Sequence, residues 1–138
     1  MLFRSIYFRT SMFTFVSNTP IQTDLRDINE FTLVYSASGD TIRIYAVHLK
    51  ASFGPPNDAQ RALEADSLRN VTNQFAAGKN FVVCGDFNIY DSNESAYQKL
   101  LLDNPNDDGN FIDPLTLNGT WANVIYSKIG RASCRERV

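Results

Sequence analysis

Two short polar stretches, each at the end of an apolar segment, carry the residue types best suited to chemistry. The first is GDFN, Gly85–Asn88, which directly follows the apolar run Phe81–Cys84. Asp86 can take a proton from water or hold a metal ion, and Asn88 offers both a hydrogen-bond donor and an acceptor. Ligands of α/β sheets bind beyond the carboxyl ends of the strands, which is where GDFN would lie. The alternative, favoured by these four residues alone, is an Asx-type turn without a catalytic role.

The second stretch is HLKAS, His48–Ser52, at the end of another apolar segment. His48 is the only histidine of the chain. Its imidazole could donate a hydrogen bond to a phosphate oxygen or protonate a leaving group. Lys50 could add positive charge for an anionic substrate. The alternatives are a histidine packed in the core and a lysine that is merely solvated, and the residues of this stretch leave both open.

The pattern before HLKAS predicts a β-hairpin. Apolar and polar residues alternate over Phe31–Tyr35 and again over Ile42–Ala46, with the turn sequence SGD between them. The alternation fades over Ala46–Leu49, as expected where a strand becomes buried on both faces. His48 is therefore expected near the end of the second arm.

A helix is predicted between the two polar stretches. Apolar residues recur every three or four positions from Ala62 to Phe75. Asn57 or Asp58 is the expected N-cap, and Gly78 is the expected residue just beyond the C-terminal end. Charged residues occupy other positions of the predicted helix, namely Arg61, Glu64, Asp66 and Arg69.

Strand, helix and strand in that order over Ile42–Cys84 predict the crossover unit of an α/β fold. The two strands need not be neighbours in the sheet. Their ends can nevertheless place His48 and Asp86 above the same sheet edge. Cys84, inside the short apolar strand Phe81–Cys84, is expected to be a small buried residue.

Weaker patterns predict the remaining elements. Glu94–Leu102 is expected to form a second helix, capped by Ser92 or Asn93. Ahead of the hairpin the sequence indicates three short strands and one turn, namely strands at Ile6–Arg9, Met12–Ser17 and Ile21–Leu25 and a turn at Ser17–Pro20.

Length and composition indicate one globular domain. The chain has 138 residues, of which 43% are hydrophobic and 12% aromatic, values typical of a folded protein. No stretch approaches the ~20 apolar residues of a membrane-spanning helix. The two cysteines lie too far apart in sequence to indicate a disulfide framework.

The last ten residues, Ile129–Val138, differ in character from the rest. They turn abruptly basic and lose the apolar pattern, and we interpret them as a non-native tail translated from a sequencing-adapter oligonucleotide; the alternative is a genuine basic tail. Leaving out their three arginines and one glutamate changes the formal net charge from −2 to −4. A mildly acidic domain is not typical of a dedicated nucleic-acid-binding module, although a nuclease that uses metal ions is compatible with it.

Taken together, these stretches resemble a known superfamily. IYAVHLKAS, then a helix containing AQRALEADSLRN, then NFVVCGDFNIYDSNESAYQKLL, are similar in order and spacing to the endonuclease/exonuclease/phosphatase superfamily of metal-dependent phosphoesterases related to DNase I. Bacterial, often secreted, members are the most similar. The resemblance covers most of Ile6–Lys128, which we take as residues 1–128 of a partial domain followed by the tail at 129–138.

The resemblance implies a fold and a set of roles. The fold would be an α/β sandwich of two packed mixed sheets flanked by helices, with outer strands missing. His48 would contact the scissile phosphate and assist as an acid, Asp86 would orient or deprotonate the attacking water, and Asn88 would position the phosphate or Asp86. Lys50 would contribute to substrate binding. A divalent ion, usually Mg²⁺, would stabilise the developing charge, with Asp86 and Asn88 among its ligands.

Other parts of the superfamily pattern have no match here. The first strand with its metal-binding Glu, and the final motif with a second histidine, have no counterpart in the sequence. We therefore expect a fragment truncated at both ends and inactive by itself, from a hydrolase whose substrate, nucleic acid among the candidates, is open. No specific protein partner is inferred. The alternative function is a non-catalytic α/β interaction domain in which His48 and Asp86 are structural.

Overall fold

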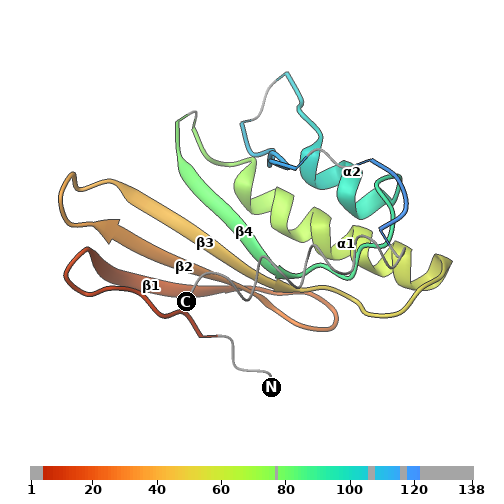
Figure 1. Ribbon diagram of the computed structural model, residues 1–138, viewed down its shortest axis with the longest axis horizontal. Coiled ribbons are helices and arrows are strands. Elements are labelled where there is room, and N and C mark those ends of the chain that lie inside the picture. The colour runs from red at the N-terminus through yellow and green to blue at the C-terminus, as the bar shows by residue number, and fades with distance from the viewer. Residues whose placement is uncertain (1–4, 77, 106–107, 116–117, 122–138) are drawn as a thin grey trace.

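The computed structural model describes residues 5–76, 78–105, 108–115 and 118–121. Within these residues the chain forms four strands and two helices (Figure 1). In chain order they are β1 (Phe13–Ile21), β2 (Ile28–Tyr35), β3 (Thr41–His48), α1 (Pro55–Thr72), β4 (Asn80–Asp86) and α2 (Ser95–Leu101). The order of strand, helix and strand expected over Ile42–Cys84 is confirmed.

The strands form one mixed sheet in the order β1-β2-β3-β4. β1, β2 and β3 are antiparallel neighbours, whereas β3 and β4 run parallel. The connection between the two parallel strands contains α1, as a parallel crossover requires. β3 and β4 are direct neighbours, so their carboxyl ends meet at the same edge of the sheet, where the chain leaves for α1 and α2 (Figure 1).

The hairpin of β2 and β3 agrees with the alternating pattern. Its turn contains Gly39 at a φ of 80°, a conformation that glycine adopts without strain. On β3, Tyr45 and Val47 point into the core under the helices, and their exposed fractions are 0% and 3%. Alternate residues such as Ile44 lie on the opposite face, opposite Phe31 of β2 and Val82 of β4.

The segment before the hairpin was predicted wrongly. Residues 6–9 form no strand, and β1 runs straight through the expected turn at Ser17–Pro20 to end at Ile21, where a separate strand was expected to begin. β1 is an edge strand of the described sheet. An edge strand tolerates a proline, because the missing N–H can fall on the side that pairs with no neighbouring strand. Residues 22–27 form a turn held by the Thr23 hydroxyl, which accepts from the Arg26 N–H and donates to the Arg26 carbonyl.

The α1 helix exists as expected, but both of its ends differ. It begins at Pro55 with Gly54 as N-cap, three or four residues before the predicted start, because proline is well suited to the first turn of a helix. Asn57 and Asp58 therefore lie inside the first turn. The helix ends at Thr72 with Asn73 as C-cap, so Gly78 does not terminate it.

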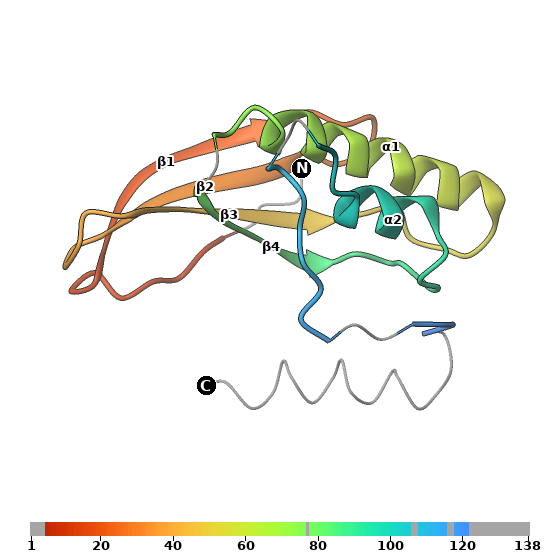
Figure 2. The ribbon, with the colours of Figure 1, turned by 90° about the horizontal axis from the view of Figure 1, so that it is seen from above.

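Three of the charged residues of α1 are buried. They are Arg61, Glu64 and Arg69, with exposed fractions of 0%, 1% and 5%. Both helices lie on the same face of the sheet, and α1 packs against the sheet and α2 (Figures 1 and 2). The loop after β3 also covers Arg61 and Glu64. Only one side of α1 is thus left to solvent. The core beneath it contains Ile28, Tyr45, Val47, Ala65, Leu68 and Leu100.

The remaining elements agree with the sequence, except for their details. α2 begins at Ser95, with Glu94 as N-cap in place of Ser92 or Asn93. β4 has Phe81 and Val83 packed against the core, whereas Cys84 is exposed and not buried as expected. Cys84 lies on the face of the sheet away from the helices, opposite Ala46.

The architecture is an α/β fold with a four-stranded mixed sheet and two helices among the described residues, consistent with a partial DNase I-like fold. The described residues contribute one sheet of the expected sandwich. The proposed tail at 129–138 lies outside the described part of the chain. Within that part, no helix has the length and apolar character needed to cross a bilayer.

Candidate active site

His48 and Asp86 are opposite each other in the sheet. They are the last residues of the parallel strands β3 and β4 and form the last pair of the register. His48 Nε2 lies 3.9 Å from Asp86 Oδ2, and the exposed fractions of the two side chains are 37% and 64%. A histidine and a carboxylate thus share one solvent-facing point at the end of the sheet, and His48 is not packed in the core.

Gly85 makes this pairing possible. Its φ is 136°, and a Cβ at this position would lie 2.0 Å from the carbonyl oxygen of Val47. Only glycine therefore lets β4 approach β3 closely just before Asp86. The two strands remain joined one step further, where the Leu49 N–H donates to the Asp86 carbonyl at 2.9 Å.

The carboxylate of Asp86 has two different surroundings. Oδ1 accepts a hydrogen bond from the backbone N–H of Asn88 at 3.1 Å, which is an Asx turn. Oδ2 faces His48. The Asx turn, which the sequence offered as the alternative to a catalytic site, is therefore present. His48 and Asp86 nevertheless lie close together, as a catalytic site requires. Asn88 has a φ of 49°, a left-handed conformation that asparagine tolerates better than most residues.

Asn88 links the two strand ends through its side chain. Its Nδ2 donates to the carbonyl oxygen of Leu49, the residue after His48, at 3.1 Å. An amide nitrogen carries two N–H groups, so one of them holds the backbone and the other is available for a ligand in addition to Oδ1. The expected role of Asn88 in positioning Asp86 fits this geometry, because the same residue closes the turn around the Asp86 carboxylate.

Lys50 is held mainly through its backbone. Its N–H donates to Glu64 Oε2 at 2.7 Å, and its ammonium group donates to the Ala51 carbonyl at 3.0 Å. The ammonium group therefore lies against its own loop in this structure. Its expected contact with substrate stays a prediction, and so do the catalytic roles of His48, Asp86 and Asn88.

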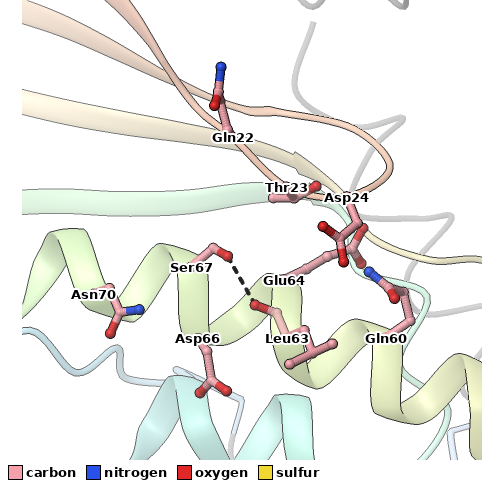
Figure 3. Close-up of a pocket in the computed structure, with 9 residues that line it drawn as sticks. All are labelled: Gln22, Thr23, Asp24, Gln60, Leu63, Glu64, Asp66, Ser67 and Asn70. Atoms are coloured by element: carbon pink, nitrogen blue, oxygen red, sulfur yellow. Dashed lines mark hydrogen bonds between the residues drawn. The ribbon is translucent and has the colours of Figure 1, made fainter.

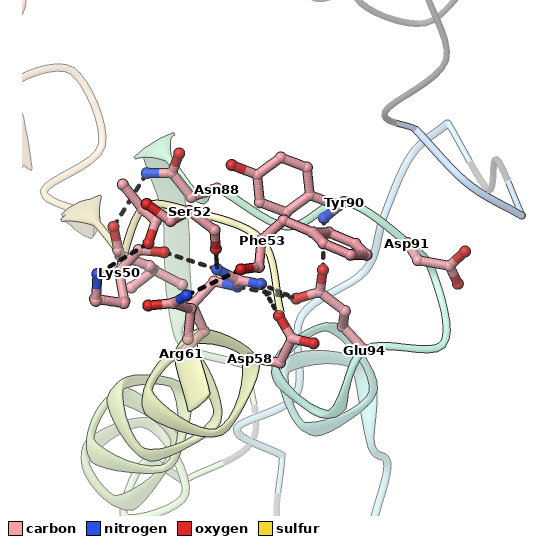
Figure 4. A network of polar contacts seen from close by, with 12 residues as sticks. Lys50, Ser52, Phe53, Asp58, Arg61, Asn88, Tyr90, Asp91 and Glu94 are labelled. Atoms are coloured by element: carbon pink, nitrogen blue, oxygen red, sulfur yellow. Dashed lines mark hydrogen bonds and ion pairs between the residues drawn. The ribbon is translucent and has the colours of Figure 1, made fainter. Parts of the chain in front are cut away.

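A buried arginine lies beneath the two loops that follow β3 and β4 (Figure 4). Arg61 Nη1 donates to the carbonyl oxygens of Lys50 and Ser52, at 2.8 and 2.9 Å. Its Nε donates to Glu94 Oε2 at 2.9 Å, and its Nη2 pairs with Asp58. The sequence pattern did not identify Arg61 as part of the site.

The arginine is also covered by an aromatic ring. The guanidinium carbon lies 5.2 Å from the centre of the Tyr90 ring, within the range of a cation–π contact. The Tyr90 N–H donates to Glu94 Oε1 at 2.8 Å. Tyr90 in turn meets the exposed ring of Phe53 edge-on, at 5.8 Å between centroids. The loops after β3 and β4 are therefore joined by polar and aromatic contacts.

The loop after β4 is held from its far side by residues 118–121. The Thr120 hydroxyl donates to Asp91 Oδ2 at 2.7 Å, and the Asn93 N–H donates to Asp91 Oδ1 at 2.7 Å. These hydrogen bonds lower the pKa of Asp91 below its ordinary value, the one from Thr120 most. Trp121 adds a backbone N–H to the Tyr90 carbonyl at 2.7 Å.

The donor set at the strand ends does not form a complete metal site by itself. Among the described residues there is no group of three or more histidine, cysteine, aspartate or glutamate side chains arranged to hold an ion. Asp86 supplies one carboxylate, and Mg²⁺ is usually held by one or two carboxylates together with water and substrate phosphate. Further ligands besides Asp86 and Asn88 would be needed to hold an ion at this site.

A separate hollow of about 460 Å³ lies between α1 and the turn after β1 (Figure 3). The turn contributes Gln22, Thr23 and Asp24, and α1 contributes Gln60, Leu63, Glu64, Asp66, Ser67 and Asn70. The lining does not include His48, Asp86 or Asn88. This hollow is therefore distinct from the strand-end site.

A comparison with protein-family models finds no matching family, and a comparison with curated proteins finds no match. Solved structures do show similar folds. The human Nocturnin catalytic domain, in a structure with a bound sulfate anion, is 28% identical with a TM-score of 0.53. An endonuclease/exonuclease/phosphatase family protein from Bacteroides thetaiotaomicron is 17% identical with a TM-score of 0.52.

The fold resembles part of the DNase I-like fold. Each comparison covers 67% of this chain, but only 36% of the Nocturnin domain and 37% of the bacterial protein. The chain therefore spans well under half the length of either structure. These likenesses support the resemblance to the endonuclease/exonuclease/phosphatase superfamily that the sequence indicated.

Proposed function

We propose that this chain is part of a divalent-metal-dependent phosphoesterase, a nuclease or phosphatase that hydrolyses phosphodiester or phosphomonoester bonds. The observation that carries the proposal is the pairing of His48 and Asp86 at the ends of neighbouring parallel strands, with 3.9 Å between Nε2 and Oδ2. Phosphoester hydrolysis requires a base near the attacking water and donors around the phosphate. A partly exposed carboxylate beside an imidazole offers both at one point.

The roles follow from the contacts. Asp86 Oδ2, free of the turn that occupies Oδ1, would orient or deprotonate the attacking water. His48 Nε2 would donate to a phosphate oxygen or protonate the leaving group. Asn88 would hold the Leu49 carbonyl with one N–H and contact the phosphate with the other. Lys50 would reach the substrate by leaving its contact with the Ala51 carbonyl.

The comparisons support an oxyanion ligand. The Nocturnin domain, whose similarity covers 67% of this chain and 36% of that domain, was solved with bound sulfate. Sulfate is a tetrahedral anion with the shape of phosphate. A divalent ion, Mg²⁺ by family resemblance, would stabilise the charge that develops on the phosphate. Asp86 and Asn88 would be among its ligands in a parent protein that supplies the others.

The 138-residue chain itself is expected to have little or no catalytic activity. Its sequence contains one histidine, and its described residues provide no cluster of three metal-ligating side chains. Without a well-held metal ion, phosphoester hydrolysis loses its main stabilisation of negative charge. The chain should therefore bind a phosphate group weakly but turn over substrate poorly.

The second candidate is a non-catalytic α/β interaction domain. In that case His48 would be a structural residue in apolar surroundings. The exposure of His48 and its position facing Asp86 favour the phosphoesterase. The exposed Phe53, on the loop beside this site, is the feature that best suits an interaction surface.

Phosphate titration followed by NMR tests the proposal. In ¹H–¹⁵N spectra of the isotope-labelled chain, inorganic phosphate, with and without Mg²⁺, should shift the amide signals of His48 and Gly85 to Asn88. The variant His48→Gln should lose this response. Asp40→Asn changes an exposed aspartate in the hairpin turn and should retain it.

Two results would contradict the proposal. A phosphate response that His48→Gln leaves unchanged would show that the anion binds elsewhere, and no response at all would remove the support for a phosphoesterase site. Activity is measured separately, with bis-p-nitrophenyl phosphate and Mg²⁺. Robust hydrolysis by the purified chain would show that the expectation of inactivity is wrong.

A further inference from the structure

Arg61 makes an unusual set of contacts for a residue in the middle of a helix. Its side chain is completely buried, and its donors contact two backbone carbonyls and two carboxylates. Arg61 shares one stripe of α1 with Ala65, Leu68 and Thr72, which are all buried. An apolar side chain on such a stripe often stabilises a core as well as a buried ion pair does. A requirement of the core alone therefore does not explain the arginine.

The partners of Arg61 lie in the two segments that carry the site residues. Lys50 and Ser52, whose carbonyls it holds, follow His48 in the chain. Glu94 and Tyr90 lie in the segment that follows Asn88, and Glu94 binds both the guanidinium and the Tyr90 N–H. One planar group thus holds both loops against each other. Figure 4 shows it between them, with Asn88 on the same side as Lys50 and Ser52.

The backbone at Ser52 gives independent support. Ser52 has a φ of 81°, a left-handed conformation that costs free energy in a residue other than glycine. Such conformations persist where surrounding contacts impose them, and they are frequent at functional sites. The Ser52 carbonyl is one of the acceptors of Arg61. The arginine therefore holds the loop in a shape that the chain would not adopt by itself.

The loop after β3 is fixed along its whole first turn. Glu64, one turn after Arg61 on α1, accepts from the Lys50 N–H, while Arg61 donates to the Lys50 carbonyl. Asn88 donates to the Leu49 carbonyl from the loop after β4. The peptide groups directly after His48 are thus held by α1 on one side and by the loop after β4 on the other.

A second ion pair between the same helices shows what a simple helix–helix contact looks like. Lys99 of α2 pairs with Asp66 of α1 at 2.6 Å, with side chains 38% and 41% exposed. This pair touches neither loop. It offers a matched comparison, because it joins the same two elements without reaching the site.

We propose that Arg61 is a positioning residue, which holds the loops after β3 and β4 in the arrangement that brings His48, Asp86 and Asn88 to the same phosphate group. The inference rests on the proposed function for its ligand. The positioning itself does not depend on catalysis. Arg61→Lys would not replace the arginine, since an ammonium group cannot span carbonyls and carboxylates in different directions as the guanidinium does.

The test compares Arg61→Met and Arg61→Lys with the control Lys99→Met. The ring signals of His48, the sole histidine, report the site in each variant, and inorganic phosphate is the probe. We expect both Arg61 variants to bind phosphate about tenfold more weakly than the wild type. Lys99→Met should stay within about twofold, as for an exposed ion pair. Hydrogen exchange of the Lys50 and Asn88 amides should accelerate in the Arg61 variants only.

Glu94→Gln is the milder variant if Arg61→Met does not fold. It removes the charge that faces Arg61 but leaves both carbonyl contacts, so it should weaken phosphate binding less than Arg61→Lys does. All binding is measured well below each variant's melting temperature. A residue that only stabilises the fold would lower that temperature but leave phosphate binding unchanged.

The outcomes separate the two proposals. If the Arg61 variants bind phosphate as the wild type does and keep the exchange rates of the Lys50 and Asn88 amides, the positioning role is wrong. If the wild type shows no phosphate response, the proposed function fails. In that case the positioning role is tested by the exchange rates of the Lys50 and Asn88 amides and by the ring signals of His48 without phosphate. It is supported if these change in Arg61→Lys but not in Lys99→Met.

Discussion

Gly85 lies so close to β3 that any side chain at this position would collide with the β3 backbone. A Cβ there would lie 2.0 Å from the Val47 carbonyl oxygen, and the φ of 136° is unfavourable for any other residue. Gly85→Ala should therefore push β4 away from β3 and lower the free energy of unfolding by at least about 2 kcal/mol. Urea unfolding followed by circular dichroism measures the loss.

Gly39 provides the control for this variant. It has a φ of 80° in the hairpin turn, but nothing lies within 4 Å of the position that a Cβ would take. Gly39→Ala thus adds the left-handed backbone cost without a collision. Equal losses in the two variants would show that the close approach at Gly85 does not matter for stability.

Tyr97 gives a prediction about pH at the same scale. Burial, followed by the hydrogen bond that its hydroxyl donates to Asp113 at 2.8 Å, raises its pKa to about 12. The folded pKa is above that of the unfolded chain, so the contribution to stability is complete below the ordinary value of about 10. It is lost as the pH rises through about 12.

Fluorescence of Trp121, the sole tryptophan, reports this titration. The Trp121 ring lies 4.8 Å from that of Tyr97, close enough for tyrosinate to quench its emission. Quenching should set in near pH 12 in the wild type and be absent in Tyr97→Phe over the same range. Quenching complete by pH 10, the ordinary range of tyrosine, would contradict the raised pKa.

At the scale of elements, the helices and strands predicted correctly from the sequence are those whose residue pattern is explained by a single structure. The hairpin follows from alternation, and β4 from a short apolar run after a helix. Their convergence follows from the crossover, which is why His48 and Asp86 could be expected above the same edge. β1 was misjudged because Asn18 and Pro20 are turn residues that an edge strand tolerates.

Arg61 shows why part of the site was not found. Charged residues are mostly exposed, so the pattern of apolar residues on α1 does not single out Arg61 as a buried residue. Its spacing from Ala65, Leu68 and Thr72 is nevertheless that of one helix face, and this was the available signal. The partners that make its burial favourable are backbone carbonyls of a loop, which no residue pattern encodes.

Asn88 joins two elements, and its two contributions can be measured separately. Asn88→Gly keeps the left-handed backbone at φ 49° but removes the bond to the Leu49 carbonyl. It should cost about 1 kcal/mol of stability. Asn88→Ala loses the same bond and also imposes the left-handed conformation on an ordinary residue, which adds about 1 kcal/mol. Thermal unfolding compares the two, and equal losses would contradict the backbone contribution.

At the scale of the whole molecule, the two faces of the sheet differ. The helices cover one face (Figures 1 and 2). On the other face, Phe31 and Leu33 of β2 are buried, whereas Phe15 of β1 and Val82 of β4, on the two edge strands, are 48% and 43% exposed. Apolar side chains that stay in water favour association between molecules. The chain should therefore self-associate, or be poorly soluble, as its concentration rises.

Light scattering coupled to size-exclusion chromatography tests this over a range of concentrations. Phe15→Glu and Val82→Lys, which place charge on the open face, should shift the chain toward monomer. Leu63→Lys is the control, because Leu63 is 55% exposed on α1 and away from that face, and it should leave the association unchanged. The prediction would be wrong if the wild-type chain were monomeric at every concentration and melted in one cooperative transition. Association through this face would instead make the melting temperature depend on the protein concentration.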